Sequence, residues 1–242
     1  MHAKKSFGQN FLVDETALQK IIKAAEIKKG ETVFEIGPGT GTLTQALMDA
    51  GARVIAIEAD KDLIAPLKKR FGNHIKLIHG DVLSDLSVLS DLSDFSFKLV
   101  SNIPYNITSP ILEKFLSTQP RPSRMVLMVQ KEVADRITAK PPNMSLLSVV
   151  CQIYARCERI AIVKAGAFRP IPKVDSAIIR LDFVHPQNPE KVIAIAKKGF
   201  SSKRKQLKSN LGPNFVAKLE QLGLNPKIRA QELTIDDWKH LL

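Results

Sequence analysis

The sequence predicts an α/β protein with an open, mostly parallel β-sheet covered by helices on both faces, followed by a small helical domain. Strand-like and helix-like segments alternate from residue 32 to about residue 140, which is typical of parallel sheets joined by helical crossovers. A glycine-rich turn, Gly37 to Gly41, follows the first of these strands. Beyond residue 185 the sequence is helical in character.

The segments follow one another in a regular order. Asp14 is expected to cap a helix that runs to about Ala25 and is ended by Lys28-Lys29-Gly30. Ser109 is expected to cap a later helix that has Pro110 at its first position. The expected strands are 32–36, 53–57, 75–78, 98–100, 124–129, 159–163 and 176–183, and the remaining expected helices are 43–48, 61–70, 131–139 and 146–153. The last two strands have no helix between them, so we expect a hairpin-like edge.

A loop at residues 185–189 (His-Pro-Gln-Asn-Pro) is expected to separate two domains. The first, residues 1–184, holds the sheet, and the second, residues 185–242, is small, basic and helical. The second contains 11 Lys/Arg and 5 Asp/Glu, which is half of the net charge of +12. A helix starting near Thr234 is expected to carry Trp238 as a packed side chain.

The composition favours a polyanionic partner. The excess of Lys and Arg points to nucleic acid, with an anionic membrane surface as the competing explanation. No run of 18 or more apolar residues is present, so we expect no membrane span. Cys151 and Cys157 lack the company that a metal site needs, so we expect buried thiols and no metal. With no secretory signal before the first motif, we expect a cytoplasmic protein, and we expect a monomer.

The glycine turn indicates a nucleotide cofactor. Gly37, Gly39 and Gly41 permit positive φ and a close approach of a ligand to the backbone. Glu58, 21 residues after Gly37 at the end of the next strand, is placed to accept from ribose hydroxyls. NAD sites share these features, but they require a glycine where Thr42 stands. With Asp81 ending the third strand to accept from an adenine amino group, the pattern favours S-adenosylmethionine on a Rossmann-like methyltransferase sheet.

The tetrapeptide Asn102-Ile103-Pro104-Tyr105 follows the fourth strand. The amide oxygen of Asn102 and a backbone carbonyl near Ile103–Pro104 can accept the two hydrogens of a nucleobase amine, which would aim its lone pair at a methyl group. Pro104 holds the turn rigid, and Tyr105 offers a face for stacking, worth roughly 1–3 kcal/mol. An ordinary strand-to-turn exit is the alternative for these four residues alone. Their position after the fourth strand favours catalysis, largely by positioning.

With these residues the chain resembles the small-subunit ribosomal RNA adenine dimethyltransferases of the kasugamycin-sensitivity type. The resemblance is carried by residues 7–12 (Phe-Gly-Gln-Asn-Phe-Leu), by the glycine turn and tetrapeptide, and by residues 168–177. It implies that Asn10, Leu12, Gly37, Glu58, Asp81 and Asn102 contact the cofactor. It also implies that Phe168 forms an aromatic clamp with Tyr105. The expected activity is dimethylation of two adjacent adenosines in a hairpin loop near the 3′ end of small-subunit rRNA, in a late assembling subunit.

Two alternatives stay open beside this one. The macrolide-resistance methyltransferases, which act on large-subunit RNA, share the tetrapeptide but generally lack the pattern of residues 168–177. A ribosome-assembly or RNA-binding factor on the same fold is the other, although Asn102 and the glycines are intact here. The loop before Leu146 departs from the family, with Asn143-Met144-Ser145-Leu146-Leu147-Ser148 where the family usually has Tyr-Gly-Arg-Leu-Ser.

Basic residues are expected to contact the RNA. Lys203, Arg204, Lys205 and Lys208 form the densest cluster and are expected on phosphates. A solvated helix face is the alternative for such a run of charge. Arg169, next to Phe168, is expected to touch the target strand.

Overall fold

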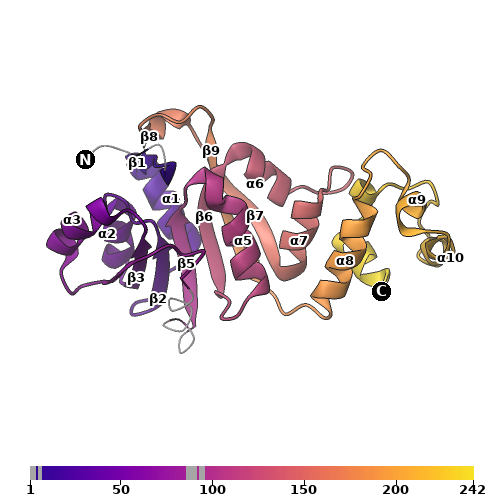
Figure 1. The fold of residues 1–242 in the computed structure, drawn as a ribbon, viewed down its shortest axis with the longest axis horizontal. Helices are drawn as coiled ribbons and strands as arrows, with labels where there is room; N and C mark the ends of the chain where they lie inside the picture. The colour runs from indigo at the N-terminus through magenta and orange to yellow at the C-terminus, as the bar shows by residue number, and fades with distance from the viewer. Residues whose placement is uncertain (1–3, 5–6, 86–91, 93–95) are drawn as a thin grey trace. The chain divides into compact units, whose positions relative to one another are not determined.

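The computed structural model describes residues 4, 7–85, 92 and 96–242, and its elements are labelled in Figure 1. A seven-stranded sheet has the order β4-β3-β2-β5-β6-β9-β7, and a two-stranded sheet joins β1 to β8. The strands are β1 Phe11–Leu12, β2 Thr32–Ile36, β3 Arg53–Glu58, β4 Lys76–His79, β5 Phe97–Asn102, β6 Arg124–Gln130, β7 Ala155–Val163, β8 Phe168–Arg169 and β9 Ser176–Phe183. All described pairings among β2 to β6 are parallel, whereas β9 runs antiparallel to β6. The expected open, mostly parallel sheet is confirmed.

The helices cover the sheet on two sides. They are α1 Glu15–Ala25, α2 Thr42–Asp49, α3 Lys61–Phe71, α5 Thr108–Ser117, α6 Lys131–Ile137, α7 Leu146–Tyr154, α8 Pro189–Gly199, α9 Leu207–Leu211, α10 Asn214–Gln221 and α11 Ile235–His240, with short 3-10 turns at Tyr105–Ile107, Ala165–Ala167 and Ala230–Glu232. Side chains of α1 and α2 pack with Val33 of β2 in one cluster. The next residue, Phe34, points to the opposite face, where its ring lies 6.0 Å from that of Phe115 on α5.

One expected helix end is confirmed and one expected cap is wrong. Asp14 does cap α1, accepting from the Ala17 N–H at 2.6 Å. The helix ends at Ala25 as expected, but the residue that ends it is Glu26 and not Lys28–Gly30, because Glu26 takes a left-handed conformation with φ 48° and donates back to the Ile22 carbonyl. The expected cap at Ser109 is wrong. The chain is already in a 3-10 turn at Tyr105–Ile107, and α5 continues directly from it at Thr108.

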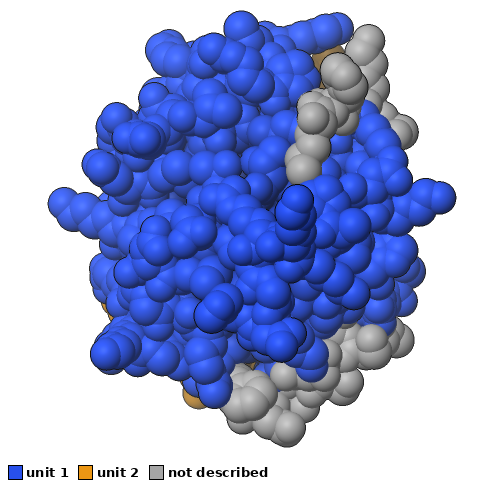
Figure 2. All heavy atoms as spheres, turned by 90° about the vertical axis from the view of Figure 1, so that its left-hand side faces the viewer, with its two compact units in different colours: residues 1–134, 158–183 blue, residues 135–157, 184–242 orange. Residues whose placement is uncertain are grey.

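The chain divides into two compact units, which have different colours in Figure 2. Unit 1 comprises residues 1–134 and 158–183, and unit 2 comprises residues 135–157 and 184–242. In unit 2, Trp238 is fully buried and stacks on Phe200 with ring centroids 5.7 Å apart, so the expected packing of Trp238 is confirmed. The domain boundary expected at residues 184 and 185 stays a prediction. In the described parts of the chain, no helix has the length and apolar character that crossing a membrane requires.

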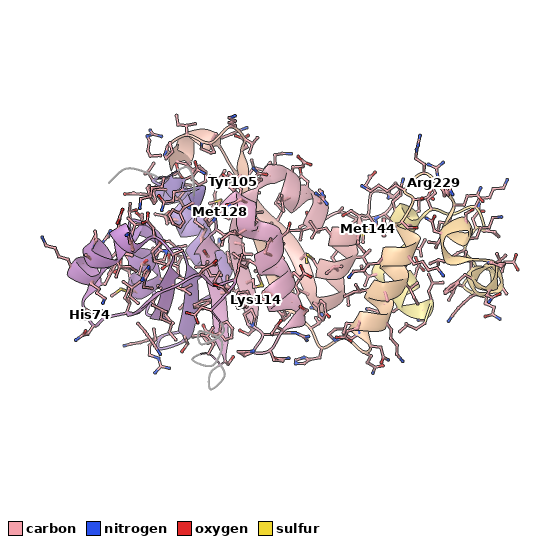
Figure 3. All side chains as sticks on the ribbon, in the orientation of Figure 1. His74, Tyr105, Lys114, Met128, Met144 and Arg229 are labelled. Carbon is pink, nitrogen blue, oxygen red and sulfur yellow. The ribbon has the colours of Figure 1, made fainter. Side chains whose placement is uncertain are left out.

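The loop that departs from the family has a packing role inside unit 2. Met144 is 5% exposed and belongs to the same buried cluster as Trp238. Its N–H donates to the Gln231 carbonyl at 3.0 Å. Ser145 then caps α7 through a reciprocal bond with Ser148. Met144, labelled with Arg229 in Figure 3, therefore fills the core of this unit.

Candidate active site

The carboxyl ends of neighbouring parallel strands bring the expected cofactor residues to one edge of the sheet. β2 pairs with β3 on one side and with β5 on the other, so the strand order reverses at β2, the usual place for a ligand in such sheets. Gly37 follows β2, Glu58 ends β3 and Asn102 ends β5. A pocket at this edge is lined by residues 7–12, 35–40, 42–43, 57–59, 80–82 and 102–107. All of them belong to unit 1.

The glycine loop leaves its backbone open to the pocket. Gly37, Gly39 and Gly41 have φ of 67°, 60° and 82°, where side chains with a Cβ are strained. A Cβ on Gly37 would meet nothing within 4 Å, whereas one on Gly39 would meet the Phe11 ring at 3.0 Å. The loop thus offers free space at Gly37 and a tight contact with the N-terminal segment at Gly39.

Two buried carboxyl groups lie beside this loop. Glu58 is 5% exposed and accepts from the Gly39 N–H at 3.1 Å and the Asp60 N–H at 2.9 Å. Burial raises the pKa of Glu58 against the opposing effect of these bonds. Glu35 accepts from the Thr44 hydroxyl at 2.7 Å. Burial, assisted by the charge of Glu58, raises the pKa of Glu35 to about 8 despite that bond, so Glu35 is a neutral acid at pH 7.

Asp81 lies at the outer side of the same pocket. It is exposed, and its Oδ1 accepts from the Leu83 N–H at 2.9 Å. An ionised carboxylate offers about four acceptor positions, so Asp81 keeps acceptor capacity for a ligand amine. The described residues offer no candidate metal site, because they contain no group of three or more His, Cys, Asp or Glu side chains that could hold an ion.

The side chain of Asn102 is oriented by the N-terminal segment. Its Nδ2 donates to the Asn10 carbonyl at 3.0 Å, which leaves Oδ1 as the acceptor end of the amide. Asn10 and Leu12 both line the pocket, and Leu12 pairs with β8. The structure therefore brings together Asn10, Leu12 and Asn102 with the glycines and acids named above.

Tyr105 and Phe168 do not form the expected aromatic clamp in this structure. Tyr105, labelled in Figure 3, lines the pocket and is half-buried, and its hydroxyl lies 2.6 Å from the Ser176 hydroxyl. Phe168 is fully buried in the core of unit 1 and is not among the residues that line the pocket. Phe168 is the strand partner of Leu12 between β1 and β8, and both side chains belong to the same buried cluster.

The expected RNA-binding residues occupy two different places in the chain. Arg169 is exposed on β8 of unit 1, and its guanidinium donates to the Gly166 and Phe168 carbonyls at 3.0 and 2.8 Å. The cluster of Lys203, Arg204 and Lys205 is exposed in unit 2. These three residues lie in a turn between α8 and α9 rather than on a helix face, and Lys208 is half-buried on α9.

Several residues of the pocket or beside it were not predicted from the sequence. Three of them, Phe7, Gln9 and Phe11, belong to the motif at residues 7–12, which was the available signal. Glu35 lies in β2, two residues before Gly37. Asp60, two residues beyond Glu58, joins the N-terminal segment to α3 through long-range contacts, and no local pattern indicates them.

Comparisons with known proteins indicate the same class of enzyme as the pocket does. A model of the family described as ribosomal RNA adenine dimethylase matches residues 1–242. The chain belongs to the ribosomal RNA adenine dimethylase family. The predicted family and enzyme class, an rRNA adenine dimethyltransferase, are thereby confirmed.

Individual relatives align with almost the whole length of this chain. A ribosomal RNA small subunit methyltransferase A from Rippkaea orientalis is 43% identical, over 97% of this chain and 94% of the relative. One from Dehalococcoides mccartyi is 38% identical, over 100% and 88%. The crystal structure of a dimethyladenosine transferase from Plasmodium falciparum has a TM-score of 0.84 at 30% identity, with 96% of each chain covered. The 23S rRNA methyltransferase ErmE has a TM-score of 0.81 at 27% identity, over 96% of this chain and 98% of that one.

Proposed function

We propose that this protein uses S-adenosylmethionine to dimethylate the amino nitrogens of two adjacent adenosines near the 3′ end of small-subunit rRNA. The observation that carries the proposal is the fixed amide of Asn102. Its Nδ2 is held by the Asn10 carbonyl, and the residue lines the same pocket as Gly37. An acceptor oxygen is therefore presented beside a glycine loop that is open to a cofactor.

The pocket fits a nucleoside cofactor. The open space at Gly37 lets a ligand approach the backbone. We assign the ribose hydroxyls to Glu58, which keeps acceptor capacity beyond its two backbone donors. We assign the adenine amino group to Asp81, and further contacts to Asn10, Leu12 and Gly39. When bound, S-adenosylmethionine supplies a methyl group on a sulfonium sulfur.

The residues of the chain act on the target base. The amide oxygen of Asn102 accepts one hydrogen of the adenosine amine, and a carbonyl of Ile103 or Pro104 accepts the other. The Pro104 carbonyl already accepts from the Ile107 N–H at 3.2 Å, and a carbonyl has a second lone pair. Both bonds draw the amine nitrogen towards tetrahedral geometry and aim its lone pair at the methyl group. The rate gain then comes mainly from positioning.

Tyr105 provides the stacking face for the base, and its hydroxyl bond to Ser176 holds the ring in place. For Phe168 we propose a supporting role, because its burial beneath β1 fixes the strand that carries Leu12. Action as the second face of a clamp would require Phe168 to leave the core. A target adenosine in a hairpin loop is unstacked at low cost, which favours its entry into such a pocket.

We infer that the RNA is held by the cluster of Lys203, Arg204, Lys205 and Lys208, with Arg169 near the target strand. The cluster residues 203–205 are exposed and lie in a turn, and the net charge of +12 supports a polyanionic substrate. We further propose that the enzyme works as a cytoplasmic monomer on a late assembling small subunit.

Large-subunit rRNA is the second candidate substrate, because the fold of ErmE is nearly as similar as that of the dimethyladenosine transferase. The pattern at residues 168–177 favours the small subunit. The deciding experiment is methyl transfer from labelled S-adenosylmethionine to undermethylated small and large ribosomal subunits in parallel, with the label mapped. Dimethylation of paired adenosines in the small subunit supports the proposal. Label confined to large-subunit RNA overturns it, and binding without any label would indicate an assembly factor.

A further inference from the structure

The carboxylate of Asp60 holds the N-terminal segment against α3. Its Oδ2 accepts from the Gln9 amide at 3.1 Å, and its Oδ1 accepts from the Lys4 ammonium at 2.6 Å. The Lys4 N–H in turn donates to the Gln9 Oε1 at 2.8 Å. The Asp60 side chain is 3% exposed, and a buried carboxylate is costly without such partners. Departure of the segment would remove two of the donors to this carboxylate, so these contacts hold residues 7–12 in place.

The held segment leads directly to the acceptor amide of the active site. Asn10 follows Gln9, and its carbonyl receives the Nδ2 of Asn102 at 3.0 Å. The segment also approaches the end of the tetrapeptide at Gly8, where a Cβ would lie 2.8 Å from the side chain of Asn106, the next residue, and 3.6 Å from that of Pro104. Any shift at Gln9 is therefore transmitted through one peptide unit to the group that orients Asn102.

Asp60 is also joined to the cofactor side of the pocket. Its N–H donates to the Glu58 Oε1 at 2.9 Å, so one residue contacts both Glu58, the acid proposed to bind the ribose, and the segment of residues 7–12 that also lines the pocket. Its other role is to cap α3, because Oδ1 accepts from the Asp62 N–H at 3.1 Å. Asn is as good a cap as Asp, which makes the two roles separable by substitution.

We propose that Asp60, acting through Gln9, is a positioning residue that holds residues 7–12 over the cofactor and aims the amide of Asn102. The inference rests on the proposed function of the pocket. It makes cofactor retention and methyl transfer depend on Asp60, which is not among the residues that line the pocket.

The test compares Asp60→Asn with Asp62→Asn. Asn at position 60 keeps a side-chain oxygen that can accept the cap bond from the Asp62 N–H. Its NH₂ group is a donor, however, and would face the Gln9 amide, which is also a donor. Asp62 lies two residues away on the same helix and also pairs with Lys4, at 2.6 Å, but its side chain is 61% exposed and it has no bond to Gln9. It is therefore the matched control. Cofactor dissociation is measured by stopped flow, methyl transfer in a single turnover at saturating cofactor and RNA, and stability by thermal unfolding.

We expect Asp60→Asn to release the cofactor about tenfold faster, the factor that corresponds to ~1.4 kcal/mol, and to slow single-turnover transfer several-fold. Asp62→Asn should stay within about twofold of the wild type in both rates, the size expected for an exposed ion pair. Gln9→Ala should reproduce the effect of Asp60→Asn without touching the cap of α3, and it keeps the test valid if Asp60→Asn folds poorly.

Two outcomes overturn the positioning role. One is that Asp60→Asn and Gln9→Ala both keep the wild-type rates of cofactor dissociation and methyl transfer. The other is a loss of thermal stability alone, which would leave Asp60 as a helix cap. Failure of the wild type to bind S-adenosylmethionine would instead overturn the proposed function, so the two failures are distinguishable.

Discussion

The buried acid Glu35 should make the stability of the protein depend on pH. In the folded protein its pKa is raised from 4.5 to about 8, chiefly by burial, whereas the Thr44 hydroxyl bond works in the opposite direction. Between these two pH values the unfolded chain has lost the proton of Glu35 and the folded chain keeps it. The free energy of unfolding therefore falls as pH rises through this window, and the loss is complete above pH 8.

The size of the stability loss follows from the width of this pH window. At ~1.4 kcal/mol for each pH unit between 4.5 and about 8, the full loss is about 5 kcal/mol. Glu35→Gln removes the ionisable group and keeps a side-chain oxygen that can accept from Thr44. The variant should resemble the wild type at pH 4.5 to 5, gain stability relative to it as pH rises, and be more stable by several kcal/mol at pH 9.

The assay is urea unfolding of the cofactor-free protein at intervals from pH 5 to 9, followed by circular dichroism. Glu113→Gln is the matched control, because Glu113 is exposed on α5. The difference between variant and wild type cancels all other titrating groups that the substitution does not affect. Parallel stability curves for wild type and Glu35→Gln would refute the argument, since they would mean that Glu35 ionises alike in both states.

Three further outcomes are expected from the proposed active site. Asn102→Ala should abolish methyl transfer while cofactor binding stays measurable, and near-normal turnover would contradict the proposed mechanism. Glu58→Ala should weaken S-adenosylmethionine binding by about tenfold or more, because a hydrogen bond to a charged group contributes ~1.5–3 kcal/mol; unchanged calorimetric affinity would exclude the ribose assignment. Reversing the charges of Lys203, Arg204 and Lys205 should weaken RNA binding and reduce the slope of log affinity against log salt by about 2 or more, whereas an unaltered slope would make them solvated surface residues.

The sequence by itself determined the sheet and the pocket residues at the ends of its strands. The β-branched run at residues 32–36 and the strand-like run at residues 176–183 located β2 and β9 to the residue, because a run of neighbouring side chains needs no distant partner to be recognised. The sequence also allowed Gly37, Glu58 and Asn102 to be assigned to one site. Gly37 follows a strand, Glu58 and Asn102 each end one, and the ends of parallel strands meet at one edge of the sheet.

The tertiary structure alone decided the features that depend on contacts between distant segments. Phe168 lies in one buried cluster with Leu12, its partner where β8 pairs with β1, more than 150 residues earlier in the chain. The neutral state of Glu35 depends on the burial that the surrounding elements create together, with the nearby charge of Glu58. The link from Asp60 to Gln9 joins α3 to the N-terminal segment. Local propensity carries no information about such pairings, because their free energy arises only when the packed fold excludes water from them.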